Sequence, residues 1–345
     1  MSHSQIRTRL ETSMHSLAAQ SRRILSKLRS RNEYRDMYRI ADGREVPDRR
    51  VAVVFGNCQA KPLSALLRNH RVFSEHYHVV SVPPVHEIAD AQVPALHSLI
   101  NKSSVLIAQE VKNGYRGLEV GTTELRGRIG DAGSLLTYPV FYYEGLYPFQ
   151  VYVRLSGDVS EQAPITGYAD LRTIYAAHQS WDVQKAWGWF RDFEVSARVI
   201  ADNSEKSLRE LERRESTLSV KGGSADIRSH LSESVLFHTV NHPSNRLLEL
   251  QASRILRSLA IVSGEEPKFS NTIEVIGDIL TPVDGRVQAA LGLGWKTETE
   301  WGVRGRKIGV ETVFKAQFEW LRARPALIDS AMLQHSSRVA SILLQ

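Results

Sequence analysis

Residues 51–67 constrain the fold more than any other part of this 345-residue sequence. Residues 51–55 form an unbroken apolar run rich in β-branched side chains, which is typical of a strand buried on both faces, as in a parallel sheet. After Pro62, leucines recur at helical spacing, and proline is tolerated in a first helical turn. The stretch therefore predicts a buried strand, a tight turn and a helix.

The turn itself reads Gly56-Asn57-Cys58-Gln59, and Cys58 is the only cysteine in the chain. A thiol beside a helix N-terminus experiences partial positive charge, so we expect a pKa below that of a free cysteine. Gly56 permits a sharp turn, and backbone N–H groups with the amides of Asn57 and Gln59 are suited to hold an oxyanion. The alternative is that Cys58 is a small buried hydrophobe without chemistry, which is the commoner state of a lone cysteine. The flanking amides favour a nucleophile turn.

Charge is distributed unevenly along the chain. Residues 1–50 hold 12 Lys/Arg and 6 Asp/Glu, which accounts for the whole net charge of +6, and the remainder is balanced. A basic arm on a neutral body argues against a nucleic-acid-binding protein. The apolar and charged fractions, 42% and 24%, are ordinary for a soluble globular protein. With one cysteine, no apolar run long enough to span a bilayer and no signal peptide, we expect a cytoplasmic location.

The arm, residues 1–50, contains a predicted basic amphipathic helix. An apolar stripe at spacings of three and four is formed by Leu10, Met14, Leu17, Ser21, Ile24 and Leu28. Such a helix is able to pack on its own domain, to pair with a partner helix or to lie on an anionic membrane surface at the inner face. Packing or pairing is the commoner outcome.

Three further strands are predicted, at 77–82, 104–108 and 138–143. Helical segments separate the first three strands, which implies parallel pairing through crossovers. Gln109 follows the third strand, and ligands of open α/β sheets gather beyond the carboxyl ends of the strands, so Gln109 and Cys58 are expected to line one crevice. From about residue 165 the pattern is helical. The predicted fold is α/β: a short, mainly parallel sheet with flanking helices over 51–155, then a mostly helical subdomain over 156–345 that completes the site.

A cysteine nucleophile needs a base, which is usually a histidine distant in sequence. Of the 12 histidines, His242 stands out because Pro243 disfavours a helical conformation at His242 just before a predicted helix. The alternative is that Asn241 and Ser244 cap that helix and His242 is incidental. His86 and His238 are weaker candidates.

A metal site is not expected. His76 and His78 give the one His-x-His spacing in the sequence, on the predicted second strand, and no third ligand lies within sequence reach.

Several motifs, in order from about residue 51 to 325, resemble those of the WcbI-type polysaccharide (capsule) biosynthesis acetyltransferases. They are the Gly-Asn-Cys-Gln turn at 56–59, Gln109, the stretch Tyr-Tyr-Glu-Gly-Leu-Tyr-Pro at 142–148, Phe-His-Thr-Val-Asn-His-Pro at 237–243 and Thr-Pro-Val-Asp at 281–284. The resemblance implies a protein that binds coenzyme A and moves acetyl groups onto sugar hydroxyls. It maps the catalytic pair onto Cys58 and His242, with Asn57, Gln59 and Gln109 as polar site residues; Asn241 belongs to the motif at 237–243.

The predicted function is therefore acetyl transfer from coenzyme A to a glycan or nucleotide-sugar acceptor. Lys61 is a candidate for meeting the phosphates of coenzyme A. Two versions stay open: Cys58 takes the acetyl group after His242 deprotonates it, or His242 activates the hydroxyl directly. One alternative is an esterase or deacetylase similar to the SGNH hydrolases, with a cysteine nucleophile, although their late Asp-x-x-His motif is not found. Another is a non-catalytic glycan- or nucleotide-binding protein.

Overall fold

The computed structural model describes residues 32–153, 162–261, 264, 266–270 and 273–344. The apolar stripe predicted at residues 10–28 lies outside them. The chain divides into two compact units, the first ending at Thr137 and the second beginning at Tyr138. Each unit is described by itself below.

The first unit is built on a four-stranded sheet. Its elements are α2 (Arg35–Ala41), β1 (Arg50–Phe55), α3 (Ala60–Asn69), α4 (Arg71–His76), β2 (Tyr77–Ser81), η1 (Val85–Glu87), η2 (Asp90–Gln92), α5 (Val93–Asn101), β3 (Val105–Gln109), η3 (Tyr115–Gly117), α6 (Thr122–Arg126) and β4 (Ser134–Tyr138). The strand order is β2-β1-β3-β4, and β1 pairs in parallel with both β2 and β3. The predicted α/β class is confirmed.

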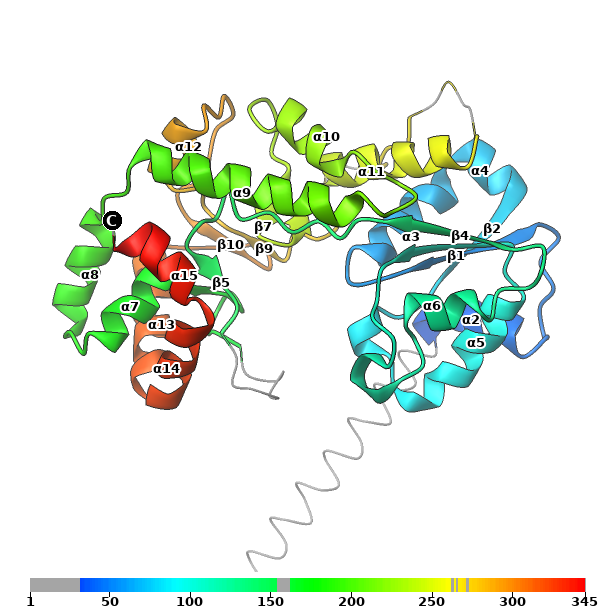
Figure 1. Ribbon diagram of the computed structural model, residues 1–345, viewed down its shortest axis with the longest axis horizontal. Helices are drawn as coiled ribbons and strands as arrows, with labels where there is room; N and C mark the ends of the chain where they lie inside the picture. The colour runs from blue at the N-terminus through cyan, green and yellow to red at the C-terminus, as the bar shows by residue number, and fades with distance from the viewer. Residues whose placement is uncertain (1–31, 154–161, 262–263, 265, 271–272, 345) are drawn as a thin grey trace, which may run out of the picture. The chain divides into compact units, whose positions relative to one another are not determined.

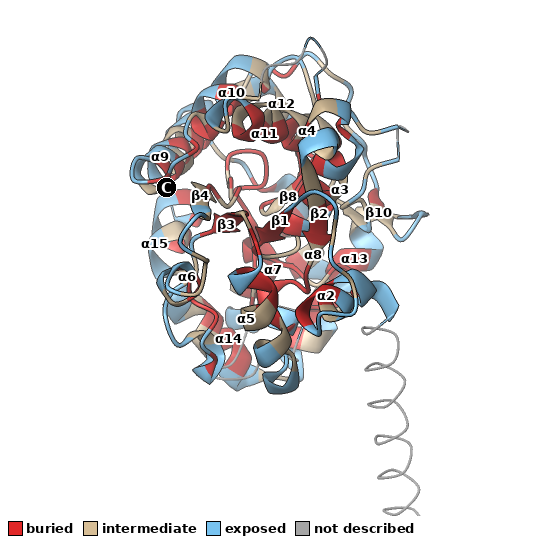
Figure 2. Cartoon of the chain, turned by 90° about the vertical axis from the view of Figure 1, so that its right-hand side faces the viewer, coloured by how far each residue is buried: buried red, intermediate tan, exposed pale blue. Residues whose placement is uncertain are grey.

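The apolar run of β1 occupies the centre of this sheet. Residues 51–55 are all buried, as is every residue of β3, and both strands appear in the buried colour in Figure 2. Val51, Val53 and Phe55 face the core beneath α2 and α5, while α3 packs on β1 and β2. Figure 1 shows α3 and α4 over one face of the sheet and α2, α5 and α6 over the other. A strand covered on both faces needs no polar residue, which explains the unbroken run.

Part of the predicted arm belongs to this core. Tyr34, Met37 and Ile40, in and just before α2, are buried in the cluster that includes β1. The ammonium group of Lys102 donates to the carbonyl oxygens of Ile40 and Ala41, at 2.7 and 2.8 Å, and so satisfies the free carbonyls at the end of α2. Residues 34–41 therefore pack on their own domain.

The second unit is mostly helical. Its helices are α7 (Leu171–His178), α8 (Val183–Asp192), α9 (Ala197–Glu215), α10 (Gly223–His230), α11 (Asn245–Ser258), α12 (Gly285–Ala290), α13 (Val310–Arg322), α14 (Pro325–Gln334), α15 (Ser336–Arg338) and the π-helical turn η4 (Val339–Leu343). Short strands complete it: β5 (Gln150–Val151), β6 (Ala169–Asp170), β7 (Phe237–Thr239), β8 (His242–Pro243), β9 (Ile279–Leu280), β10 (Trp301–Val303) and β11 (Arg306–Ile308). The predicted helical region is confirmed.

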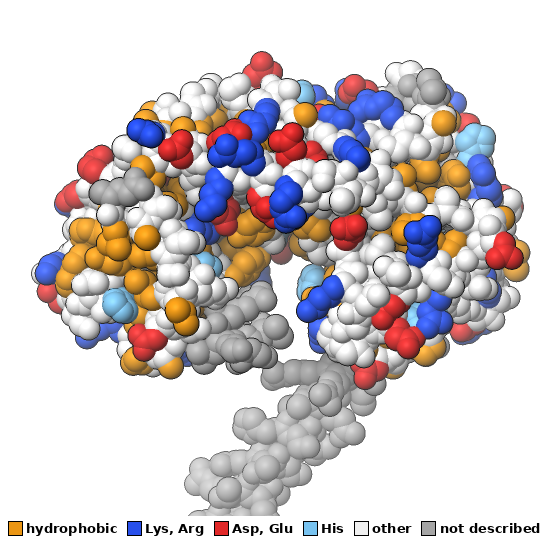
Figure 3. Space-filling model, in the orientation of Figure 1, with side chains coloured by type: hydrophobic (Ala, Val, Ile, Leu, Met, Phe, Trp, Pro, Cys, Tyr) orange, Lys and Arg blue, Asp and Glu red, His pale blue; other side chains and the backbone are white. Residues whose placement is uncertain are grey.

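Polar caps define where many of these helices begin. Aspartate or serine side chains accept backbone N–H groups of the first turn in five of them: Asp170 for α7, Asp182 for α8, Ser196 for α9, Ser244 for α11 and Asp284 for α12. Such residues satisfy donors that the helix leaves free. Beyond its cap, α9 exposes Lys/Arg and Asp/Glu side chains that alternate over the surface in Figure 3, with pairs such as Arg213 and Glu210.

Two local predictions were wrong. The fourth strand is β4, Ser134–Tyr138, rather than 138–143, because the aromatic residues Phe141 and Tyr143 are buried in the core of the second unit, where the Tyr143 N–H donates to Val240 at 2.7 Å. His76 ends α4 and does not share a strand with His78. Aromatic runs fill helical cores as readily as sheets, so periodicity could not separate the two.

Candidate functional site

The turn after β1 lies at the switch point of the sheet. The chain leaves β1 to reach β2 on one side and then crosses over to β3 on the other. In such sheets the crevice outside the carboxyl ends of the two diverging strands is where ligands bind. Cys58 follows β1, and Gln109 ends β3. The topology therefore places both residues at the edge where a ligand is expected.

Three amide side chains form a closed ring around Cys58. The Asn57 N–H donates to Oε1 of Gln109 at 2.8 Å, and Nε2 of Gln109 donates to Oε1 of Gln59 at 3.2 Å. The Gln59 N–H in turn donates to Oδ1 of Asn57 at 2.9 Å. Gln59 and Gln109 are each only 1% exposed. These hydrogen bonds fix the turn to β3. They use the backbone N–H groups of Asn57 and Gln59 and the side-chain oxygens of both amides, which were predicted, with backbone N–H groups of the turn, to hold an oxyanion.

Gly56 is required by the close approach of Gln109. A Cβ at position 56 would lie 2.8 Å from Cδ and 3.0 Å from Cγ of Gln109, closer than side-chain carbons pack. The Gly56 carbonyl oxygen also accepts the Val85 N–H at 2.8 Å, which brings the loop after β2 against the turn. Glycine at this position therefore allows the ends of β1 and β3 to pack closely.

Cys58 is partly exposed, and its thiol is not activated. Burial raises the pKa of Cys58, and the carboxylate of Glu87 raises it further; the backbone N–H groups of Cys58 and Gln59 oppose this shift. Desolvation disfavours thiolate more strongly than nearby N–H dipoles favour it. The predicted lowering of this pKa is wrong, and Cys58 rests as a neutral thiol at neutral pH.

Lys61 and His86 lie in the same unit as Cys58. Lys61, in the first turn of α3, is exposed and forms an ion pair with Glu33. His86 lies on η1 with its side chain 47% exposed, and its Nε2 is 3.7 Å from the Glu87 carboxylate. Because η1 begins at Val85, whose N–H donates to Gly56, His86 belongs to the segment that contacts the Cys58 turn.

The second candidate region is a hairpin in the other unit, residues 237–243, which we call the His242 hairpin. It consists of β7 and β8, which pair antiparallel around a bulge. Ser244 follows it and caps α11 through a hydrogen bond from the Leu247 N–H at 3.4 Å. Asn241 has no part in this cap, so the capping alternative holds for Ser244 alone.

His242 is held as a neutral imidazole. Burial, the larger cause, and the neighbouring His238 together lower the pKa of His242 to about 4, and Asp278 acts in the opposite direction. Nε2 lies 3.5 Å from the Tyr168 hydroxyl, and the two rings meet edge to face at 6.1 Å. Nδ1 is buried without a hydrogen-bond partner among the described residues. A neutral ring with a free nitrogen is able to accept a proton.

Asn241 binds a cluster of hydroxyl groups next to His242. Its Oδ1 accepts from the hydroxyls of Tyr168 at 2.7 Å, Thr239 at 3.2 Å and Tyr152 at 3.3 Å. The Tyr168 hydroxyl also accepts from Thr239 and Tyr152, each at 3.1 Å. Tyr168 is therefore the centre of a network that positions the hairpin. Sequence reasoning missed Tyr168, which is 74 residues from His242 and carries no motif.

His238 lies against a carboxylate. Its Nε2 is 2.9 Å from Oε2 of Glu274, which also accepts the Asn245 N–H at 2.7 Å. His238 is 8% exposed. Glu274, which sequence reasoning also missed, thus fixes the hairpin and the start of α11 together.

Comparison with known proteins decides the family. A sequence profile described as polysaccharide biosynthesis enzyme WcbI matches residues 51–263, more than half of the chain. The chain belongs to the WcbI family. The predicted resemblance is confirmed, and the match spans both the Cys58 turn and the His242 hairpin.

A solved structure of a WcbI protein has the same fold. It aligns with a TM-score of 0.73 and 20% sequence identity over 85% of this chain and 98% of its own. It is described as a novel polysaccharide biosynthesis enzyme, the native protein without a disulfide bond between coenzyme A and a cysteine. No curated protein matches the sequence significantly.

The described residues contain neither a cluster suited to a metal ion nor a helix suited to span a membrane. No three His, Cys, Asp or Glu side chains among them gather closely enough to hold a metal ion. No helix in the described part of the chain combines the length and apolar character needed to cross a membrane.

Proposed function

We propose that this WcbI protein transfers an acetyl group from coenzyme A to a sugar hydroxyl in the biosynthesis of capsular or other surface polysaccharide. The observation that carries the proposal is the amide ring that holds Cys58 at the switch point of the sheet. A merely structural cysteine needs no such ring. The coenzyme A and cysteine named for the solved WcbI structure support a donor site at this turn.

Cys58 lies beside the sulfur of the donor in this proposal. Its raised pKa keeps the thiol neutral. Without a thiolate, Cys58 carries no negative charge and does not attack the incoming thioester. Lys61 is available for a phosphate group of coenzyme A, because its exposed ion pair with Glu33 contributes little stability and is easily exchanged. The Cys58 turn thus binds and orients the donor.

His242 is the proposed general base. Its neutral imidazole accepts the proton of the sugar hydroxyl while the hydroxyl oxygen forms a bond to the thioester carbonyl carbon. The carbon–sulfur bond then breaks, and the leaving sulfur receives the proton from His242. No acetyl group resides on the enzyme in this version, so the raised pKa of Cys58 favours direct transfer over an acetyl-cysteine intermediate.

The acceptor is a glycan or a nucleotide sugar, and we place the reaction in the cytoplasm. Residues 1–50 are proposed to provide a contact with a partner protein or with the inner face of the membrane. Their basic charge suits both surfaces.

Calorimetry with coenzyme A and acetyl-coenzyme A tests the donor site. We expect binding that weakens in Gln109→Met, which breaks the amide ring at nearly constant volume, and that persists in Gln92→Met, a control on η2. Absence of binding to the wild-type protein at millimolar ligand would overturn the proposal.

Product analysis separates transfer from hydrolysis. Acetyl-coenzyme A is incubated with the enzyme and an oligosaccharide fraction, and acetylated sugar and free acetate are measured together. Acetylated sugar is expected. Acetate release that ignores added sugar would instead identify a hydrolase.

A further inference from the structure

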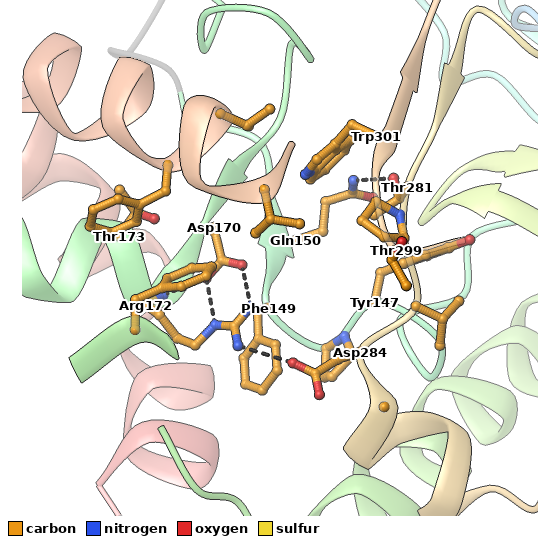
Figure 4. A pocket seen from close by; sticks show the side chains of 18 of the residues that line it. Tyr147, Phe149, Gln150, Asp170, Arg172, Thr173, Thr281, Asp284, Thr299 and Trp301 are labelled. Carbon is orange, nitrogen blue, oxygen red and sulfur yellow. Dashed lines mark hydrogen bonds and ion pairs between the residues drawn. The ribbon is translucent and has the colours of Figure 1, made fainter. Parts of the chain in front are cut away.

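A pocket of about 580 Å³ lies within the second unit. Its volume is in the range that accommodates small molecules. Segments from β5 and β6, α7, α8, the 281–284 loop, α12, β10 and α13 line it, and Figure 4 shows its interior. We call it the Arg172 pocket. None of the residues proposed for catalysis lines it, so its role is separate from that of the Cys58 turn.

The base of the pocket is a buried arginine clamped between two carboxylates. Arg172 donates to Oδ1 and Oδ2 of Asp170 at 3.1 and 2.8 Å, and to Oδ2 of Asp284 at 3.1 Å. Its guanidinium also lies 4.0 and 4.1 Å from the ring centres of Phe149 and Phe190. The clamp holds both carboxylates rigidly. Asp284 also accepts from Arg286 and has no lone pair left, whereas Oδ2 of Asp170 accepts one donor and can take a hydrogen bond from a ligand hydroxyl.

Aromatic side chains form the walls. Trp187, Trp301 and Phe314 line the pocket, and Trp301 is 9% exposed. In Figure 4 the indole of Trp301 faces the interior, next to the amide of Gln150. A flat apolar wall beside fixed polar groups suits a ligand with an apolar face and a polar edge. A sugar ring has this form, with C–H bonds on its face and hydroxyl groups around its edge.

One buried polar atom in this pocket lacks a partner. The hydroxyl of Thr173 is completely buried, lines the pocket and makes no hydrogen bond within the described part of the chain. Buried hydroxyl groups are nearly always hydrogen-bonded, because an unpaired one costs stability. An orphaned hydroxyl in a pocket wall therefore points to a polar ligand that supplies the missing partner.

The buried charge of the pocket does not suit a diphosphate. Each arginine that lines it is already bound by carboxylates: Arg172 by Asp170 and Asp284, Arg286 by Asp284 and Glu194, and Arg191 by Asp192. A diphosphate requires unpaired cations or a row of free N–H groups. The buried Arg172 is held by both aspartates and is not free to meet one, so the interior of the pocket suits a neutral ligand.

The pocket is joined to the His242 hairpin by a shared side chain. Oε1 of Gln150 accepts the Val240 N–H at 2.9 Å, and its Nε2 donates to the Thr281 hydroxyl at 2.9 Å. The Thr281 N–H donates to the His238 carbonyl at 2.9 Å. Val240 is two residues before His242, so a ligand in the pocket lies next to the hairpin that carries the proposed base.

We propose that the Arg172 pocket binds a neutral sugar ring of the acceptor glycan. This inference rests on the proposed function and adds that the acceptor is recognised as an uncharged sugar rather than through a nucleotide diphosphate. The aromatic walls contact the ring face, and Asp170 and the Thr173 hydroxyl bind its hydroxyl groups.

Ligand-observed NMR on the full-length protein tests this proposal. The probes are the methyl glycosides of glucose, galactose and mannose, with uridine diphosphate as the charged comparison. A ligand of about 13 non-hydrogen atoms binds at millimolar concentrations, so about 20 mM of each probe suffices. We expect saturation transfer to at least one glycoside. Uridine diphosphate should show no saturation transfer that changes in variants of this pocket.

Conservative variants locate the binding. Thr173→Val keeps the shape of the side chain and removes the orphaned hydroxyl, and Trp301→Phe removes the indole N–H but keeps an aromatic wall. Thr173→Val should weaken glycoside binding about fivefold, the effect of one lost hydrogen bond, and Trp301→Phe should weaken it because the smaller ring covers less of the sugar face. Lys206→Ala, in a separate pocket beside α9, is the control and should have no effect.

Binding of no glycoside would overturn the inference, as would binding that both pocket variants leave unchanged. Either result leaves coenzyme A binding at the Cys58 turn intact if the proposed function is correct. Conversely, loss of coenzyme A binding with glycoside binding retained would overturn the proposed function alone.

Discussion

The side-chain oxygen of Gln109, at the end of β3, accepts the backbone N–H of Asn57, just after β1, at 2.8 Å. This hydrogen bond joins two strand ends that are 52 residues apart in sequence. It makes the turn that carries Cys58 a rigid part of the sheet, and it leaves no room for a side chain at Gly56. The geometry of the turn therefore depends on Gln109 as much as on the residues next to Cys58.

Replacing Gly56 by alanine should destabilise the first unit. The new methyl group would lie 2.8 Å from the amide carbon of Gln109, and overpacking of this kind costs about 1–3 kcal/mol. Urea unfolding measures the change. Gly127→Ala is the matched control, because a Cβ there meets its nearest neighbour at 3.6 Å. Equal stability of the Gly56 variant and the wild type would show that the turn opens readily.

Alkylation of Cys58 by iodoacetamide should rise only at high pH. Because burial raises the pKa of the thiol, the midpoint of the rate should lie above the value of about 8.5 for a free cysteine. Glu87→Gln removes a negative charge near the sulfur and should lower the midpoint. A wild-type midpoint below pH 8 would restore the activated thiol that the sequence suggested.

Stability should fall on acidification through the titration of His242. Its pKa is about 4 in the folded protein and near 6.5 in an unfolded chain, so the unfolded chain binds more protons between these values. The contribution of neutral His242 to the free energy of unfolding is complete above pH 6.5 and is lost as the pH falls toward 4. It amounts to about 2 kcal/mol between pH 7 and pH 5.

Urea unfolding at several pH values measures the slope of the free energy of unfolding against pH. His242→Asn should flatten it, whereas His178→Asn, at the exposed end of α7, should not. An unchanged slope in the His242 variant would mean that this ring is not held neutral by the fold.

Replacing His242 and replacing Cys58 should change different kinetic parameters. If His242 is the base, His242→Ala should lower kcat by about 10²–10⁴. Cys58→Ala should mainly raise KM for the acetyl donor, and the two effects should add in the double variant. Steady-state kinetics and mass spectrometry of the enzyme during turnover provide the measurements.

Similar residual activity in both single variants and the double variant, with an acetylated Cys58 in the wild type, would instead establish the covalent route. His86→Ala and His238→Ala serve as comparisons. If only one of these abolishes turnover while His242→Ala does not, that histidine is the base.

The sequence was sufficient to predict the three parallel strands of the first unit, because residues 51–55 of β1 are covered on both faces and contain no polar side chain. It also predicted the turn at residues 56–59, since glycine, cysteine and two amides leave few other structures. The position of Gln109 followed from the rule that strand ends meet at one edge of a parallel sheet.

The sequence could not give the thiol pKa or the partners of His242. Burial and the charge of Glu87 determine the first, and neither is visible in residues 56–59. The network around His242 depends on Tyr168, which reaches it through tertiary packing alone. Likewise, Arg172 and Asp284 meet across 112 residues with no motif to link them.

Arg172, Asp170 and Asp284 should vary together during evolution. Both aspartates cap helices, and Arg172 bridges them inside a pocket, so loss of Arg172 leaves Asp170 without its counter-ion and loss of both aspartates leaves a buried, unpaired guanidinium. A lineage can leave this arrangement only by exchanging all three residues within few steps. Relatives of this chain should therefore fall into two groups, one with the complete triad and one with none of it, and their acceptor preferences should follow that division.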